Sequence, residues 1–351
     1  MKKTLFGLLV LAILALNCKK TIDVLPIIQP TLKDLPFPFG AAISTPLLKS
    51  DTAYQNTIIR QFKSVSTENA MKARVIHPLE NVYSWTDADE ILAFAQKHGL
   101  RVHGHTLNWY GDQPDWITNF QGNQAAWEQM MKSHIQTIVG HYKGRVKSWD
   151  VVNEAFEDDG TLRNTIWLQK LGPDYIARAF QYAHEADPDA KLFYNDYGQE
   201  FGYEYKGLKR TAIIAMANDF MKRGIPIHGL GLQMHTKYTQ SDVDISLAIT
   251  TAAATGLLVH ISELDVALNP NFDYTLVYSQ SLAEMQASKY KSIVKIYNGI
   301  PKAQQYGITT WNVGDKDSWL PPHYGRPDWP LPFDTNYKPK LAFQGILDAV
   351  K

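Results

Sequence analysis

Residues 146–196 decide the fold, because they hold a complete strand–helix–strand unit. The unit begins with VKSWDVVN (residues 146–153) and ends with AKLFYND (residues 190–196). Both runs are short and rich in β-branched or aromatic residues, as buried strands are. Between them, YIARAFQYAHEA (residues 175–186) repeats apolar residues with the helical period, bracketed by Pro173 and Pro188. A helix between two such strands predicts a parallel strand pair with a helical crossover.

The same alternation runs through the rest of the chain. The strand-like runs are Phe37–Ile43, Lys63–Thr67, Leu100–Trp109, Val146–Asn153, Ala190–Asp196, Ile227–His235, Leu257–Leu264 and Gly307–Val313. Amphipathic stretches fall between them, for example Thr86–His98, Ala126–His141, Tyr175–Ala186, Lys206–Arg223 and Tyr274–Asn298. Eight strands alternating with helices predict an α/β fold of the (β/α)8 TIM-barrel type. A doubly wound open sheet is the alternative, but the first strand–helix junction, Ser44-Thr45-Pro46, has no glycine-rich phosphate turn.

Composition narrows the function classes. The chain has 351 residues, of which 45% are apolar and 20% charged, enough for a sizeable core. Lys plus Arg and Asp plus Glu balance at 35 each, so the chain has no excess of basic residues that would indicate nucleic-acid binding. Nine Trp and 18 Tyr supply core packing and also flat faces suited to an uncharged ligand such as a sugar.

The N-terminus resembles an export signal. Two lysines follow Met1, and the apolar run Leu5–Leu16 is too short to span a bilayer but suits a signal-peptide core. It ends at Cys18, the only cysteine, as in a bacterial lipoprotein processing site. We predict a signal peptide over residues 1–18 with lipidation at Cys18, a tether over 19–35, and one (β/α)8 domain over 36–351. The alternative is a plain secretory peptide, since Asn17 is not the small residue usual before such a cysteine.

Export of this kind predicts an outer-membrane or cell-surface lipoprotein that contacts the membrane only through its lipid. The processed chain would have no cysteine for disulfides or thiolate metal sites. We expect a monomer.

Polar residues gather at the predicted carboxyl ends of the strands, where a barrel places its active site. They are Glu68, Asn69, His105, Trp109, Asn153, Glu154, Asn195, Asp196, Gln233, His235, Glu263, Asp265 and Trp311. A rim built only for stability would not collect carboxylates, amides, imidazoles and indoles together, so the sequence predicts a site there.

Glu154 and Glu263 narrow its chemistry, because they close the fourth and seventh strands on opposite sides of the barrel mouth. Glycoside hydrolases use two carboxyl groups that face each other across a cleft. Asn153 precedes Glu154 and suits a sugar 2-hydroxyl. Asp265 lies two residues after Glu263, hence on the same strand face, and we predict a chain in which Asp265 holds His235 and His235 holds Glu263.

The motifs resemble those of glycoside hydrolase family 10, the barrel-type xylanases, over nearly the whole processed chain. Trp149–Ala155 (WDVVNEA) resembles that family's acid/base signature, and Ile261–Asp265 (ISELD) resembles its nucleophile strand. Matching motifs in barrel order are ENAMK (68–72), GHTLNW (104–109), YNDY (194–197), GLGLQMH (229–235) and WNVGDKDSW (311–319).

This resemblance implies a retaining endo-1,4-β-xylanase acting on xylan or xylo-oligosaccharides, with no cofactor and no metal. Glu154 would be the acid/base and Glu263 the nucleophile, with Asp265 supporting them. The implied substrate-binding residues are Glu68, Asn69, Lys72, His105, Trp109, Asn153, Asn195, Gln233, His235, Trp311 and Trp319. Among these, Trp109, Trp311 and Trp319 would form apolar walls.

Four positions depart from the family pattern. Ala73 replaces a usual Trp, Tyr110 and Asp112 replace a usual His and Gln, and Asn312 replaces a usual Gly. We expect these changes to cluster on the glycone side, away from the catalytic pair, and to alter subsite specificity. Asp112 would bring a charge to a sugar contact.

Three other functions are compatible with parts of the pattern. One is a related glycosidase acting on a β-glucan, and another is a lipoprotein that captures glycans without cutting them. The third is a metal hydrolase, since His103 and His105 point the same way along a strand. Histidine pairs of that class usually open the first strand, and this pair lies on the third.

Overall fold

The computed structural model describes residues 30–202 and 207–351. The predicted signal peptide, Cys18 and residues 19–29 of the predicted tether lie outside these residues. Residues 31–35 of the predicted tether belong to the folded unit, which begins at Thr31. A short 3-10 helix, η1 (Leu32–Asp34), buries Leu32, and the Leu32 amide donates to Gln61 Oε1 over 3.2 Å. The compact unit thus includes five residues that precede the predicted domain start at residue 36.

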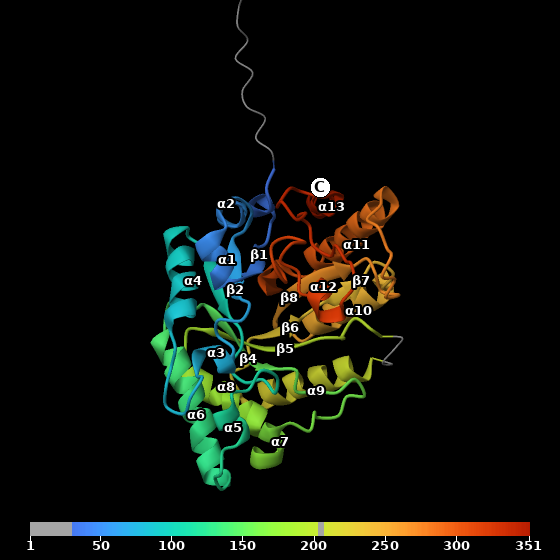
Figure 1. The fold of residues 1–351 in the computed structure, drawn as a ribbon. Helices are drawn as coiled ribbons and strands as arrows, with labels where there is room; N and C mark the ends of the chain where they lie inside the picture. Colours follow the sequence, from blue (N-terminus) through green and yellow to red (C-terminus); the bar gives the residue numbers. More distant parts are fainter. Residues whose placement is uncertain (1–29, 203–206) are drawn as a thin grey trace, which may run out of the picture. The chain divides into compact units, whose positions relative to one another are not determined.

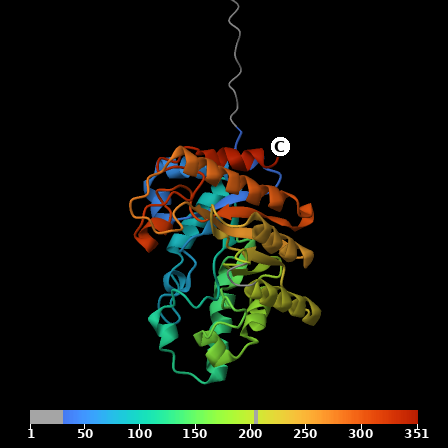
Figure 2. The same ribbon diagram turned by 90° about the vertical axis from the view of Figure 1, so that its right-hand side faces the viewer.

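Eight parallel strands close into a barrel, as predicted, because β6 pairs with both β5 and β8. Helices lie around the strands in two views (Figures 1 and 2). The barrel strands are β1 (Phe39–Ile43), β2 (Ser64–Thr67), β3 (Arg101–Gly104), β4 (Ser148–Asn153), β5 (Lys191–Asp196), β6 (Gly229–Leu232), β8 (Leu258–Ala267) and β9 (Gln305–Thr310). Most of their residues are buried, since side chains fill the barrel on one face and helices cover the other.

The helices follow the predicted stretches. The longer ones are α2 (Thr52–Gln61), α4 (Thr86–Lys97), α6 (Gln124–His141), α8 (Tyr175–Ala186), α9 (Leu208–Arg223), α10 (Asp242–Ala254), α11 (Gln280–Asn298) and α13 (Leu341–Asp348). Shorter helices are α1 (Thr45–Ser50), α3 (Ala73–Ile76), α5 (Asp115–Thr118), α7 (Ile166–Leu171) and α12 (Leu320–Tyr324), with the 3-10 turn η2 (Lys302–Gln304). In the described part of the chain, no helix is long and apolar enough to cross a membrane.

Capping residues set helix starts that the periodicity did not predict. α11 begins at Gln280 rather than Tyr274, because the Ser279 side chain accepts from the Leu282 amide and ends the preceding loop. α6 begins two residues before the predicted Ala126, since Asn123 caps it in the same way.

Two predicted strands are shorter than expected, and both differences shape the site. β3 ends at Gly104, and the chain then crosses towards β4, which it meets again at the isolated bridge Asn108–Val152. The run Ile227–His235 divides into β6 and the short β7 (His235–Lys237), because Met234 takes a left-handed conformation with φ of 61°. This turn moves His235 from the barrel wall to a pairing with Asp265 on β8.

Candidate active site

A cavity of about 460 Å³ lies at the carboxyl ends of the strands, with walls of carboxylates, amides, imidazoles and aromatic rings. Its volume is that of a small-molecule site. Among the predicted site residues, those in its walls are Lys72, His105, Trp109, Asn153, Glu154, Gln233, His235, Glu263, Trp311 and Trp319. Three more aromatic residues complete the lining: Tyr197, Phe201 and Tyr324.

Glu154 lies just after β4 in a left-handed conformation with φ of 58°. In a regular strand, successive side chains point to opposite faces. This turn interrupts that pattern, so that the neighbouring side chains of Asn153 and Glu154 both reach the cavity, as predicted. The Glu154 carboxylate accepts a hydrogen bond from Trp109 Nε1 at 3.0 Å on Oε2. Its Oε1 accepts from Asn153 Nδ2 at 3.1 Å and Gln233 Nε2 at 2.9 Å. Three donors from three strand ends thus fix the carboxylate.

Glu263 projects from β8 and is only 4% exposed. Its Oε1 accepts from Asn195 Nδ2 at 2.7 Å, and its Oε2 lies 3.2 Å from His235 Nε2. Burial alone would raise the pKa of Glu263, but the hydrogen bond from His235 and the charges of His105 and His235 outweigh it. The pKa of Glu263 is therefore below its ordinary value, and the carboxylate stays ionised.

His235 lies between two carboxylates. Its Nδ1 is 2.8 Å from Asp265 Oδ2, while its Nε2 faces Glu263. Burial opposes the charged ring, but the charge and hydrogen bond of Asp265, with those of Glu263, raise the pKa of His235 to about 10. Trp319 Nε1 also donates to Asp265 Oδ2, over 2.8 Å. The predicted chain from Asp265 through His235 to Glu263 is present, and Trp319 is a hydrogen-bonded part of it as well as an apolar wall.

Asn195 joins the two halves of the site from beneath. Its Nδ2 donates to Asn153 Oδ1 at 3.0 Å as well as to Glu263, and its Oδ1 accepts from Ser262 Oγ at 2.6 Å. Because its side chain is fully buried, Asn195 holds other residues in place and does not line the cavity, unlike the predicted sugar contact. Gly231 leaves room for it, since a Cβ there would lie 2.2 Å from Asn195 Oδ1.

Lys72 stands at the side of the cavity formed by β2 and β9. Its Nζ lies 5.2 Å from the ring centre of Trp109 and 5.7 Å from that of Trp311, and donates to Asn69 Oδ1 at 2.9 Å. Glu68 and Asn69 are not part of the lining, and Asn69 is exposed. Burial raises the pKa of Glu68 despite Lys72 and a hydrogen bond from the Asn312 side chain.

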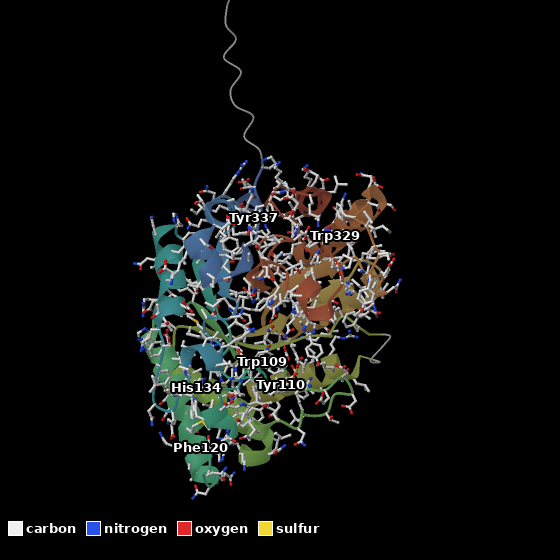
Figure 3. The ribbon with its side chains drawn as sticks, in the orientation of Figure 1. Trp109, Tyr110, Phe120, His134, Trp329 and Tyr337 are labelled. Carbon is white, nitrogen blue, oxygen red and sulfur yellow. The ribbon has the colours of Figure 1, made fainter. Side chains whose placement is uncertain are left out.

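The departures from the family pattern do not share one location, contrary to expectation. Ala73 and Asn312 are buried, and Asn312 has a φ of 90°, a conformation in which a glycine would be unstrained. Asp112 pairs with Arg74, with 2.8 Å between Oδ1 and Nε, so its charge is engaged by a neighbour and it does not line the cavity. Tyr110 lies beside Trp109, with 5.9 Å between the ring centres (Figure 3), and Trp109 in turn donates to Glu154.

His103 and His105 do not form a metal site with other side chains. Both rings face the buried carboxylate of Asp150, with His103 Nε2 at 3.0 Å and His105 Nδ1 at 2.9 Å. Among the described residues, no cluster of three or more His, Cys, Asp and Glu side chains is arranged to hold a metal ion. The two imidazoles stabilise Asp150, whose pKa stays well below its usual value although burial acts against this.

Comparison with known proteins decides the family. The profile of glycosyl hydrolase family 10 matches residues 30–349. The chain is a member of glycosyl hydrolase family 10. It is 38% identical to endo-1,4-beta-xylanase B of Paenibacillus barcinonensis, covering 89% of this chain and 95% of that protein.

A second relative, exoglucanase XynX of Acetivibrio thermocellus, is 34% identical over 93% of this chain and 30% of its own length. Among solved structures, xylanase 10B of Thermotoga petrophila in complex with xylobiose superimposes with a TM-score of 0.85 at 33% identity. That match covers 92% of this chain and 97% of the xylanase. The protein is thus a glycoside hydrolase with the TIM barrel of its family.

The protonation state of the His235 ring gives a direct test of the electrostatics of the site. We expect NMR to show its ring charged up to about pH 10. Asp265→Asn should move that titration well down towards the ordinary histidine value of about 6.5. Because the folded pKa is raised, the stability that His235 contributes is complete below its unfolded pKa and is lost as pH rises through about 10.

His235→Gln assigns the signal, and Asp348→Asn, far along the chain on α13, is the matched carboxylate control that should leave the titration unchanged. A wild-type His235 that titrates near pH 6.5 would contradict this description of the site.

Proposed function

We propose that this family 10 enzyme is an endo-1,4-β-xylanase that hydrolyses xylan by a retaining double displacement, with Glu154 as acid/base and Glu263 as nucleophile. The observation that carries the proposal is the contrast between the two carboxylates in one cavity. Glu263 is buried and kept ionised by a charged imidazole, while half-buried Glu154 is held by neutral donors. A retaining mechanism needs one ionised nucleophile and one group that can carry a proton.

In the first step, the Glu263 carboxylate attacks the anomeric carbon as the glycosidic bond breaks. Glu154 gives its proton to the departing sugar oxygen, so no charge is left on the leaving group. Asn153 and Gln233 reach both Glu154 and the space beside it, where they meet the hydroxyls of the reacting sugar. His235 stays protonated and holds the second oxygen of Glu263 during the attack.

In the second step, water hydrolyses the ester between the sugar and Glu263. Glu154, now a carboxylate, takes a proton from that water, and the released Glu263 regains its hydrogen bonds from His235 and Asn195. The enzyme thus returns to its starting proton count. Every group in the cycle belongs to the protein or the substrate.

The named relatives support xylan as the substrate. The Paenibacillus protein is named a xylanase, and the Thermotoga petrophila xylanase was solved with xylobiose. Xylose lacks the C6 hydroxymethyl group of glucose, and we infer that this group would have to clash with Trp311 and Trp319 of the cavity wall or fit beside them. The Acetivibrio relative is named an exoglucanase, so a β-glucan is the substrate to compare.

The enzyme should release a ladder of short xylo-oligosaccharides from linear β-1,4-xylan and little from a β-glucan, as separation of the products by length over time will show. Glu263→Ala should abolish cleavage. Glu154→Ala should slow it by a factor of up to about 10⁴, because proton transfer is then left to water.

Glu90→Ala, on the exposed side of α4, is the matched carboxylate control and should cleave at the wild-type rate. Cleavage of glucan but not xylan would overturn the substrate assignment. Binding of xylan without any cleavage would favour a glycan-capture protein, and inhibition by a chelator would favour a metal hydrolase.

We also propose that the protein is exported and held at the outer membrane or cell surface by a lipid on Cys18. The support is the sequence alone: a basic start, the apolar run Leu5–Leu16, and then the single cysteine. In a bacterial host with lipoprotein processing, the wild type should incorporate a labelled fatty acid and sediment with membranes. Cys18→Ala should do neither, whereas Cys18→Ala indistinguishable from the wild type would rule the anchor out.

A further inference from the structure

Three consecutive carbonyl groups, beginning at the proposed acid/base, accept hydrogen bonds from one residue, Arg163. Its Nε donates to the carbonyl oxygen of Glu154 over 3.0 Å, and its Nη2 donates to that of Phe156 over 3.1 Å. Between them, the Arg163 backbone amide donates to the carbonyl oxygen of Ala155 over 2.8 Å. One residue thus fixes the stretch of backbone that leaves β4 through Glu154.

The guanidinium of Arg163 is itself held on several sides. Its Nη2 also donates to the Tyr197 hydroxyl over 2.8 Å, and its Nη1 lies 3.0 Å from Glu157 Oε2. The ring of Tyr110 lies on it, with 4.6 Å between the ring centre and Cζ. Only 14% of the Arg163 side chain is exposed, so the group has little freedom to move. Because Tyr197 belongs to the cavity wall, Arg163 connects that wall with the backbone of Glu154.

The backbone at Glu154 needs this support. A residue with a side chain rarely adopts a φ near 58°, and such a conformation persists only where its surroundings fix it. On the strand side, the Glu154 amide donates to the carbonyl oxygen of Asn195 on β5 over 2.9 Å. On the loop side, the bonds from Arg163 complete the constraint. The turn is therefore held at both ends.

The turn decides where the Glu154 carboxyl lies. Its two oxygens accept from Trp109, Asn153 and Gln233 over 2.9 to 3.1 Å, and these donors fit only one placement of the group. A proton donor must also come within about 2.6–3.2 Å of the atom that receives the proton. A small rotation of the Glu154 backbone would move the carboxyl away from its donors and from the leaving oxygen together.

We propose that Arg163 is a positioning residue for proton transfer, which keeps the Glu154 backbone in its left-handed turn and so aims the carboxyl at the leaving oxygen. The inference rests on the proposed function and adds to it a residue outside the cavity lining. Arg163 acts through Glu154 and not on the sugar. Its planar fork matters more than its charge, because two carbonyl groups can be held at once only by donors with a fixed spacing.

Substrates with different leaving groups separate this role from sugar binding. Arg163→Lys keeps the charge and the backbone amide but loses the fork. Its kcat/KM for xylotetraose, whose leaving sugar needs a proton, should fall about 10- to 100-fold, since a misplacement of about 1 Å costs roughly that much. Its kcat/KM for an aryl xylobioside with an activated leaving group should change less than about twofold, because that group departs without a proton.

The second step gives a readout that a general loss of folded protein would not change. On the aryl substrate, kcat and KM of Arg163→Lys should fall together, because a misplaced Glu154 takes the proton from water slowly and the glycosyl-enzyme accumulates. Azide attacks the glycosyl-enzyme without a general base. Added azide should therefore restore kcat of the variant and leave that of the wild type nearly unchanged.

A second variant and a matched control complete the experiment. Arg163→Gln removes both the fork and the charge, and it should show the same dependence on the leaving group. In the control, Arg178→Lys, the arginine also donates to a backbone carbonyl, that of Leu171 over 3.0 Å, and to Glu128 over 2.8 Å, but it lies on the outer helix α8. Its rates on both substrates should equal those of the wild type.

The ratio of the two kcat/KM values does not depend on how much of a variant is folded, so it decides the outcome. Equal losses on the two substrates would overturn the inference, and so would unchanged rates. A loss confined to Arg163→Gln would overturn it too, since the charge and not the fork would then matter. A wild type that cannot cleave xylotetraose would refute the proposed function itself, whereas a normal wild type with unaffected Arg163 variants would refute only this inference.

Discussion

The site depends on one charged imidazole held between two carboxylates. His235 lies 2.8 Å from Asp265 and 3.2 Å from Glu263, and the two carboxylates raise the pKa of its ring, which in turn lowers the pKa of Glu263. Removing His235 would leave two buried carboxylates without their shared counter-charge, and an uncompensated buried charge is far more costly than an exposed one. On β3 and β4, a carboxylate lies between two imidazoles instead. Asp150 Oδ2 is 3.0 Å from His103 Nε2 and 2.9 Å from His105 Nδ1.

The barrel explains why these groups meet although the chain separates them widely. Closure through the β6–β8 pair brings the ends of β4, β5, β6 and β8 to one rim. From there, hydrogen bonds run from Glu263 through Asn195 to Asn153 and on to Glu154. The two proposed catalytic groups are therefore linked through protein side chains, and a shift of one strand would be transmitted to both. Left-handed turns at Glu154 and Met234 then point side chains inward where a regular strand would alternate them.

Strand–helix alternation predicted the barrel, and strand-end chemistry predicted most of the cavity lining. The helix Tyr175–Ala186 matches because two prolines bound it, whereas α11 starts late because a local serine cap overrides its periodicity. Tyr324 was missed because it ends α12, a helix of five residues that is too short for a period to place its side chains. Asn195 was assigned to the sugar because sequence shows a strand end but not how deeply a side chain is buried.

The stereochemistry of the first product tests the central claim most directly, because it reports whether Glu263 attacks the sugar or activates water. Proton NMR of xylotetraose hydrolysis, followed before mutarotation, resolves the α and β anomers of the new reducing end. Retention through a glycosyl–Glu263 intermediate predicts that the β anomer appears first and then equilibrates. Initial release of the α anomer would mean a single displacement by water and would contradict the role of Glu263 as nucleophile.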